Sequence, residues 1–134
     1  MTNLKAIRSA ASRLKGYVRE TPILTSPFLN EIAGKNIYVK IPVVNSKGVF
    51  MGKIIKELNN KNIKLNITAV YTAKQTQKIL KSINKKSKVI ISIFAGRAGD
   101  VGKDPVPEIK QSIALSKKFK NVEILWASVR EPYN

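Results

Sequence analysis

The 134-residue sequence contains no cysteine and no histidine. Without cysteine it has no disulfide framework and no thiolate nucleophile. Without histidine it lacks the most common general base, the usual zinc ligands and any Ser-His-Asp triad. It also lacks a bilayer-spanning segment, because its longest apolar runs have the length of single strands. The basic N-terminus has no continuous apolar stretch of the kind found in Sec signal peptides. We therefore expect a cytoplasmic protein with no metal site and no membrane partner.

Acidic residues are scarce, with 8 Asp and Glu against 25 Lys and Arg, which gives a formal net charge of +17. Such an excess of positive charge is typical of nucleic-acid-binding proteins. However, 20 of the cations are lysines, spread over expected helix ends and loops instead of lying along one stripe with interleaved aromatics. The five arginines leave little capacity for reading base edges. We expect no specific nucleic-acid partner, only salt-sensitive binding of polyanions.

Strand-like and helix-like segments alternate from residue 37 to residue 128. Apolar runs predict strands over 37–44, 65–71, 88–94 and 122–128. Helical periodicity predicts helices over 46–58, from the Thr72–Gln75 capping box to about Ile83, and over 107–119. A loop rich in Gly, Asp and Pro separates residue 94 from the last helix. This alternation predicts a parallel α/β sheet covered by helices, either doubly wound or part of a (β/α) barrel.

The alternation of side chains along each strand favours the barrel. One face of the first strand is aliphatic and should meet the helices, while Lys40 lies on the other. The later strands likewise carry a polar group on one face: Asn66 and Thr68 opposite Leu65, Ile67 and Ala69; Ser92 with Ile90 and Phe94; Ser128 with Ile124 and Trp126. A polar residue on one face of every strand is typical of a barrel interior near its active end.

Lys40 is the single lysine in the aliphatic run NIYVKIPVVN, residues 36–45. Burial among aliphatic neighbours favours the neutral form of an amine, and a neutral amine can attack a carbonyl to form a Schiff base. The alternative is that Lys40 extends its ammonium group to solvent from an edge strand. The residue pattern alone does not separate these two readings.

From residue 36 onward the chain resembles the transaldolase and fructose-6-phosphate aldolase family. The matching segments are VKIPV (39–43), NITAVYTAKQ (66–75), SIFAGRAGDVG (92–102) and ILWASVRE (124–131). The resemblance implies strands four to seven of a (β/α)8 TIM barrel and a Schiff base between Lys40 and a ketose. It assigns a catalytic role to Thr68 and places substrate phosphate near Arg97, Ser128 and Arg130. It implies a sugar-phosphate substrate and no metal or organic cofactor.

Residues 6–40 resemble a different family, the N-termini of threonine dehydratase and serine racemase, in the segment AASRLKGYVRETPILTSPFLNEIAGKNIYVK (10–40). Those enzymes use pyridoxal phosphate, but the GSFK-type segment that supplies their cofactor lysine does not follow here. The two resemblances divide the chain into a helical segment, 1–35, and a partial barrel, 36–134. Within the first segment, the residue pattern predicts a helix over 2–15 and a short helix over 27–33. They suggest a fused or misassembled reading frame.

The resemblance to the transaldolase and fructose-6-phosphate aldolase family implies a protein that cleaves or transfers a dihydroxyacetone unit of sugar phosphates, in carbohydrate metabolism of the pentose phosphate type. We expect impaired turnover, because the family's acidic proton-transfer residues come from strands that have no counterpart here. Open sheet edges predict a homo-oligomer. The alternatives are a pyridoxal-dependent ammonia-lyase fragment and a non-catalytic basic α/β domain that binds polyanions.

Overall fold

The computed structural model describes residues 9, 12–13 and 37–130. The chain separates into two units, Met1–Asn36 and Ile37–Asn134. Of the first unit, Ser9, Ser12 and Arg13 are helical. The rest of the helix predicted over 2–15, and the helix predicted over 27–33, lie outside the described residues. The domain boundary predicted between residues 35 and 36 stays a prediction.

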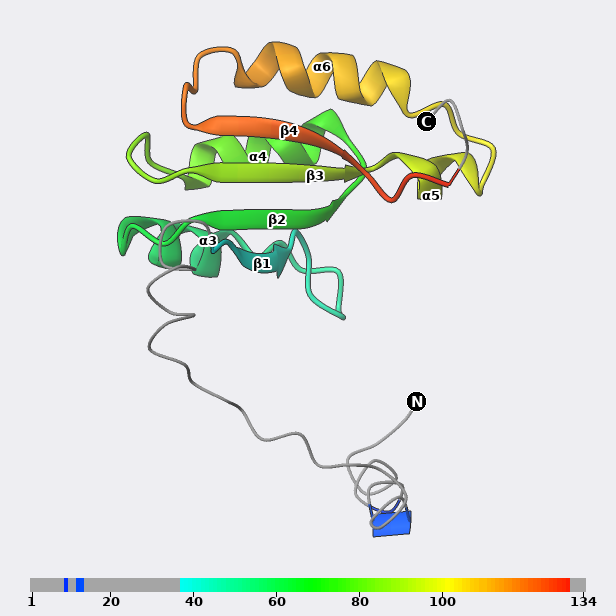
Figure 1. Ribbon diagram of the computed structural model, residues 1–134, viewed down its shortest axis with the longest axis horizontal. Helices are drawn as coiled ribbons and strands as arrows, with labels where there is room; N and C mark the ends of the chain where they lie inside the picture. Colours follow the sequence, from blue (N-terminus) through cyan, green and yellow to red (C-terminus); the bar gives the residue numbers. More distant parts are fainter. Residues whose placement is uncertain (1–8, 10–11, 14–36, 131–134) are drawn as a thin grey trace. The chain divides into compact units, whose positions relative to one another are not determined.

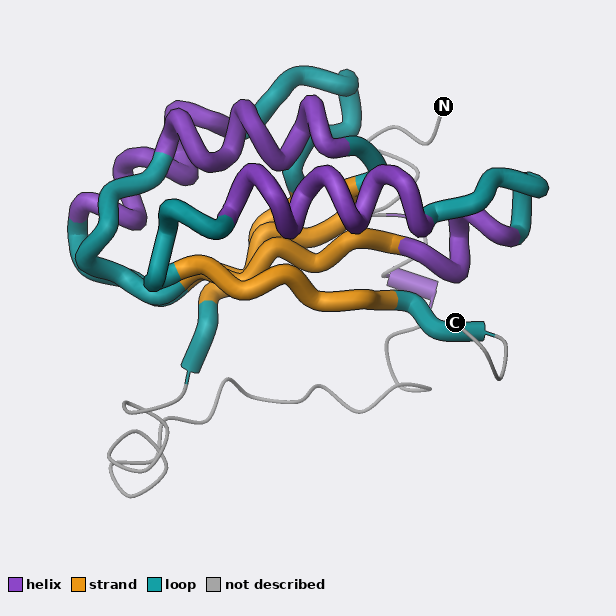
Figure 2. The backbone as a smooth tube through the Cα atoms, turned by 90° about the horizontal axis from the view of Figure 1, so that it is seen from above, coloured by secondary structure: helices purple, strands orange, loops and turns teal. Residues whose placement is uncertain are grey.

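The second unit is a four-stranded parallel sheet whose strands alternate with helices (Figure 1). The elements follow the order β1 (Val39–Pro42), α3 (Gly52–Asn60), β2 (Leu65–Val70), α4 (Ala73–Ser82), β3 (Val89–Phe94), α5 (Ala95–Gly99), α6 (Val106–Ser116) and β4 (Val122–Ala127). The strands lie side by side in sequence order, β1-β2-β3-β4. Helices α3, α4 and α6 cover one face of the sheet (Figure 2). Sequential strands with helices on one face are consistent with a partial (β/α)8 barrel, whereas a doubly wound sheet reverses its strand order and carries helices on both faces.

The core lies between the sheet and these helices. Alternate residues of the strands point into it and are almost fully buried: Ile41, Val43, Leu65, Ile67, Val70, Val89, Ile91 and Ile93. Helices α3, α4 and α6 contribute Ile55, Ile79 and Ile109 from their facing sides. Lys40, Asn66, Ile90 and Glu123 form one row across the opposite face, because they are successive partners in the strand register. We call this opposite face, which no described helix covers, the open face.

The helix predicted over 46–58 starts six residues later than expected. The side chain of Asn45 accepts hydrogen bonds from the backbone N–H groups of Lys47 and Val49 at 2.9 and 3.0 Å. Gly48 has a φ of 74°, a left-handed conformation that glycine adopts without steric cost. These features hold residues 45–49 in a turn, so α3 begins only at Gly52. The spacing of apolar residues in 46–58 places Met51, Ile54, Ile55 and Leu58 on one helical face. Ile55 is fully buried but Ile54 is 43% exposed, so this prediction is wrong for Ile54.

A β-bulge in β2 changes the predicted side-chain parity. Ala69 has a φ of 57°, and the register with β3 shifts between Ile67 and Val70. The extra residue returns Val70 to the core in place of Ala69, which was the residue predicted to be buried. The bulge also changes the side on which Tyr71 lies. Simple alternation along the strand predicts that Tyr71 points away from the face that carries Lys40. Tyr71 instead packs edge-on against Phe94, with 5.9 Å between ring centroids.

The last strand also departs from the prediction. Ile124 and Trp126 pack against the core, so the face they share is the helix-covered one. Ser128 was expected on their face, but β4 ends at Ala127 and Ser128 adopts a φ of 61°. The alternation of a strand therefore does not extend to Ser128. The capping box at Thr72 and Gln75 is confirmed, whereas the short helix α5 lies where a loop was expected.

Candidate active site

Lys40 and Thr68 lie on the open face of two neighbouring strands. Lys40 is the register partner of Asn66, and Thr68 follows Asn66 by two residues, so all three share this face. The hydroxyl of Ser92 on β3 donates a hydrogen bond of 2.7 Å to the side-chain oxygen of Asn66. Three adjacent strands thus contribute polar groups to one continuous area of the open face.

The hydroxyl of Thr68 is buried without a hydrogen-bond partner in the described part of the chain. The residue as a whole is 8% exposed. A buried hydroxyl that makes no hydrogen bond costs free energy, about 1–3 kcal/mol in protein mutational data. Such a group is suited to hold a water molecule or a substrate oxygen. This hydroxyl lies two residues along β2 from Asn66, the register partner of Lys40.

The side chain of Lys40 is exposed, so of the two alternatives that the residue pattern leaves open the structure has the solvent-extended one. Two features explain this exposure. Among the described residues, β1 has a hydrogen-bonded strand on one side only. The aliphatic neighbours Ile41 and Val43 point into the core on the other face and therefore do not surround the amine.

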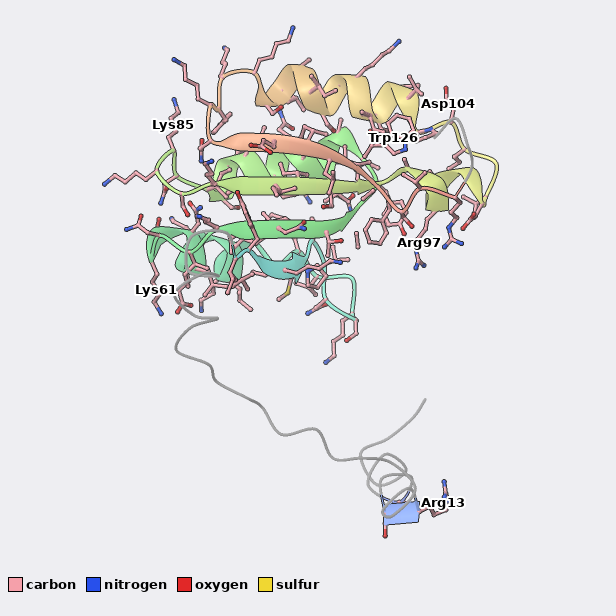
Figure 3. All side chains as sticks on the ribbon, viewed as in Figure 1. Arg13, Lys61, Lys85, Arg97, Asp104 and Trp126 are labelled. Atoms are coloured by element: carbon pink, nitrogen blue, oxygen red, sulfur yellow. The ribbon has the colours of Figure 1, made fainter. Side chains whose placement is uncertain are left out.

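The three predicted phosphate ligands gather near α5, at the carboxyl ends of β3 and β4. Arg97 lies on α5, with its guanidinium group 5.6 Å from the centre of the Phe94 ring. Arg130 forms an ion pair of 3.1 Å with Asp100, just after α5. The backbone carbonyl of Ser128 packs against Gly96. Figure 3 shows Arg97 at this end of the sheet.

Gly96 is what allows this close approach. A Cβ atom added at Gly96 would overlap the carbonyl oxygen of Ser128 and press on the Arg130 side chain. We expect Gly96→Ala to lower the free energy of unfolding by about 1–3 kcal/mol, the usual cost of overpacking. Urea denaturation followed by circular dichroism measures this loss. Gly99→Ala is the matched control, because a Cβ there meets nothing within 4 Å. Equal losses in the two variants would contradict the assigned role of Gly96.

The carboxylates among the described residues are engaged away from Lys40. Glu57 pairs with Lys61 at 3.0 Å, and Asp100 with Arg130. Glu108 accepts a hydrogen bond from the backbone of Ala73, and Asp104 from that of Val106. Glu123 lies in the row of Lys40 but three strands away, about 15 Å at the usual strand spacing. Within residues 37–130, therefore, no carboxylate is placed to exchange a proton directly with a group bound at Lys40.

A cavity of about 500 Å³ lies beside Tyr71, bounded by the 98–105 segment and Glu108. None of the five predicted site residues lines it. The sequence could not indicate this cavity, since its walls come from loops whose contacts are tertiary. The ion pair between Arg130 and Asp100 was missed for the same reason. The parity change at Tyr71 had no sequence signal either, because the bulge occurs at an ordinary alanine.

The described residues contain neither a metal-binding cluster nor a membrane-spanning helix. No group of three or more Asp or Glu side chains is arranged to hold a metal ion there. No helix in that part of the chain is long and apolar enough to cross a membrane.

One comparison relates part of the chain to a serine racemase. It is 40% identical over 47 residues to serine racemase of Dictyostelium discoideum, a match that covers 35% of this chain and 14% of that protein.

The broader similarity is to transaldolases. The chain is 32% identical over 98 residues to a probable transaldolase of Herpetosiphon aurantiacus, which covers 72% of this chain and 41% of that protein. It is 37% identical over 130 residues to a probable transaldolase of a Sulfurihydrogenibium species, covering 95% of this chain and 52% of that protein. The chain thus spans about half the length of these relatives. The sequence profile of Transaldolase/Fructose-6-phosphate aldolase matches residues 5–134. Because this profile matches nearly the whole chain, and because the chain forms a parallel sheet as expected for that profile, the chain belongs to the transaldolase/fructose-6-phosphate aldolase family.

Proposed function

We propose that this protein captures a phosphorylated ketose as a Schiff base on Lys40, the first step of reversible aldol cleavage or dihydroxyacetone transfer. The proposal is supported by family membership together with one structural observation. Lys40 shares the open face with Thr68, whose hydroxyl is buried and unpaired in the described chain. An amine beside an unsatisfied hydroxyl is the arrangement that a carbonyl substrate needs.

In the proposed chemistry, the neutral amine of Lys40 adds to the ketone carbonyl, and water leaves as the iminium ion forms. The bond between the α-carbon and the β-carbon of the iminium ion then breaks. Its electrons enter the iminium system, and a proton leaves the hydroxyl group on the β-carbon. Thr68 would hold the water that is lost and regained at the imine. Neither a metal ion nor an organic cofactor is required for these steps.

Arg97, Ser128 and Arg130 are proposed to bind the substrate phosphate. A guanidinium group matches the geometry of a phosphate, and the loops after late strands are the usual phosphate sites of barrels. These residues gather around α5, at the carboxyl ends of β3 and β4. Binding would require Arg130 to share its charge between Asp100 and the phosphate. A role in pentose phosphate metabolism and a cytoplasmic location stay predictions.

The test is reduction with borohydride in the presence of a phosphorylated ketose, followed by mass spectrometry of the peptides. We expect an adduct on Lys40 and little or no aldol cleavage, because no described carboxylate is positioned to move protons at the imine. A general acid or base contributes about 10²–10⁴-fold to a rate, so its loss impairs turnover more than capture. Adducts spread evenly over the surface lysines would overturn the proposal.

We further propose that the open edges of the sheet lead to self-association. Among the described residues, β1 and β4 each pair with one strand only, which leaves backbone donors and acceptors available for another chain. We expect a melting temperature that rises with protein concentration and a dimer or larger species in sedimentation experiments. A monomer with a sharp melt that is independent of concentration would contradict this.

The resemblance of residues 6–40 to threonine dehydratase and serine racemase supports a further proposal, that this segment has a separate origin. The match to serine racemase favours it, whereas the family profile that begins at residue 5 favours a continuous transaldolase-type chain. The DNA on either side of the reading frame tests the idea. Neighbouring pieces of a threonine dehydratase gene would support a fusion, and a single uninterrupted transaldolase gene would exclude it.

A further inference from the structure

Lysines concentrate in the three loops that lead from helices into strands β2, β3 and β4. These loops are 61–64, 83–88 and 117–121, and all three lie at the amino end of the parallel sheet (Figure 1). They contain Lys61, Lys64, Lys85, Lys86, Lys88, Lys117, Lys118 and Lys120, which we call the amino-edge lysines. No acidic residue occurs within the three loops. The sequence spreads these lysines over sixty positions, whereas the fold brings them to one edge.

Hydrogen bonds connect the three loops into one rigid unit. The side chain of Asn84 donates to the backbone carbonyl of Asn59 at the end of α3, at 3.1 Å, and its backbone N–H donates to the Asn59 side chain at 2.6 Å. The hydroxyl of Ser87 donates to the carbonyl of Ile63 at 2.9 Å. The amide of Asn121 donates to the carbonyls of Asn84 and Ser87, at 3.0 and 2.7 Å. The amino-edge lysines are therefore carried by a preorganised support, which lowers the entropic cost of binding through several of them at once.

Charge is distributed unequally between the two ends of the sheet. Asp100, Asp104 and Glu108 lie at the carboxyl end, where they accompany Arg97 and Arg130. At the amino end, Glu57 and Glu123 are the described carboxylates nearest in sequence to the three loops, and Glu57 is paired with Lys61. Figure 3 shows Lys61 and Lys85 at the end opposite to Arg97. The larger excess of lysines over carboxylates thus lies at the amino end, remote from the proposed active site.

We propose that the amino-edge lysines bind the phosphodiester backbone of single-stranded RNA without sequence preference. Charge neutralisation by several closely spaced lysines is the main source of such binding. Asparagine amides such as that of Asn62 in the first loop and that of Asn60 at the end of α3 can add hydrogen bonds to sugars and bases. An anionic membrane is a poorer match, because the exposed large hydrophobic side chains of the described chain all lie outside these three loops. These loops therefore present no exposed large hydrophobic side chain to insert into a bilayer.

The experiment measures fluorescence anisotropy of a labelled uridine oligonucleotide of about 16 nucleotides against the full chain, over a range of salt concentrations. The variant Lys86→Gln/Lys118→Gln/Lys120→Gln removes three exposed lysines from the patch. The matched control Lys47→Gln/Lys103→Gln/Lys110→Gln removes three exposed lysines elsewhere and has the same net charge. Surface substitutions of this kind change stability by about 0.5 kcal/mol or less, so both variants should fold.

We expect the patch variant to lose about tenfold or more in affinity, and its salt slope to fall by about 0.7 for each phosphate contact removed. The control variant should stay within about twofold of the native protein, and an oligonucleotide of mixed sequence should bind as well as the uridine one. Equal losses in both variants would show that only net charge matters. Tighter binding to phosphatidylserine vesicles than to RNA, or a strong preference for one sequence, would also overturn the proposal.

Discussion

Replacing Lys40 with alanine should abolish the capture of a phosphorylated ketose that borohydride makes permanent. Only an amine can form the imine that borohydride reduces, and Lys40 is the lysine on the open face next to the unpaired Thr68 hydroxyl. We expect the adduct on the peptide that contains residue 40 to fall from a measurable fraction to background, at least tenfold. Intact-mass and peptide-mass spectrometry of the reduced protein provide the measurement.

Lys47→Ala is the control for this experiment. Lys47 is also exposed but lies in the turn after β1, where its backbone N–H donates a hydrogen bond to the side chain of Asn45. Its loss should leave the adduct at residue 40 unchanged. If the total adduct is the same in native protein, Lys40→Ala and Lys47→Ala, the reaction is a property of surface lysines in general and the proposed site is wrong.

Ile67→Ala should remove a large part of the stability of the fold. Ile67 is fully buried in β2, between β1 and β3, and packs into the cluster that joins the sheet to its helices. Truncating a buried isoleucine to alanine costs about 2–5 kcal/mol, because the cavity that it leaves closes only in part. Domains are typically stable by about 5–15 kcal/mol, so this single change would leave a marginal fold. Urea denaturation gives the loss as a shift in the transition midpoint.

The same substitution at Ile54 tests which face of α3 is buried. The spacing of apolar residues assigns Ile54 to the buried face, but the structure leaves it 43% exposed while Ile55 is fully buried. Ile54→Ala should therefore cost less than about 0.5 kcal/mol, as expected for a surface change. A loss as large as that of Ile67→Ala would mean that Ile54 belongs to the core.

Sequence pattern alone was sufficient for the architecture of the second unit. Apolar runs of strand length, alternating with helical periodicity, predict the four strands and three of the helices, because a buried parallel strand and an amphipathic helix each require a distinct repeat of apolar residues. The capping box at Thr72 and Gln75 could also be predicted, because both partners lie within one turn. The placement of Lys40 and Thr68 on one face follows from the same local alternation.

Other features were decided by tertiary structure. The bulge at Ala69 and the left-handed conformation of Ser128 interrupt the alternation, and neither residue type signals them. The exposure of Lys40 depends on what covers the open face, which no local pattern encodes. The concentration of lysines at one edge arises because every helix-to-strand loop of a parallel sheet meets at the same end. The sequence by itself determined the four strands, three of the helices and their order, through local periodicity. Only the tertiary structure decided which polar groups lie together, because residues far apart in the chain become neighbours through packing.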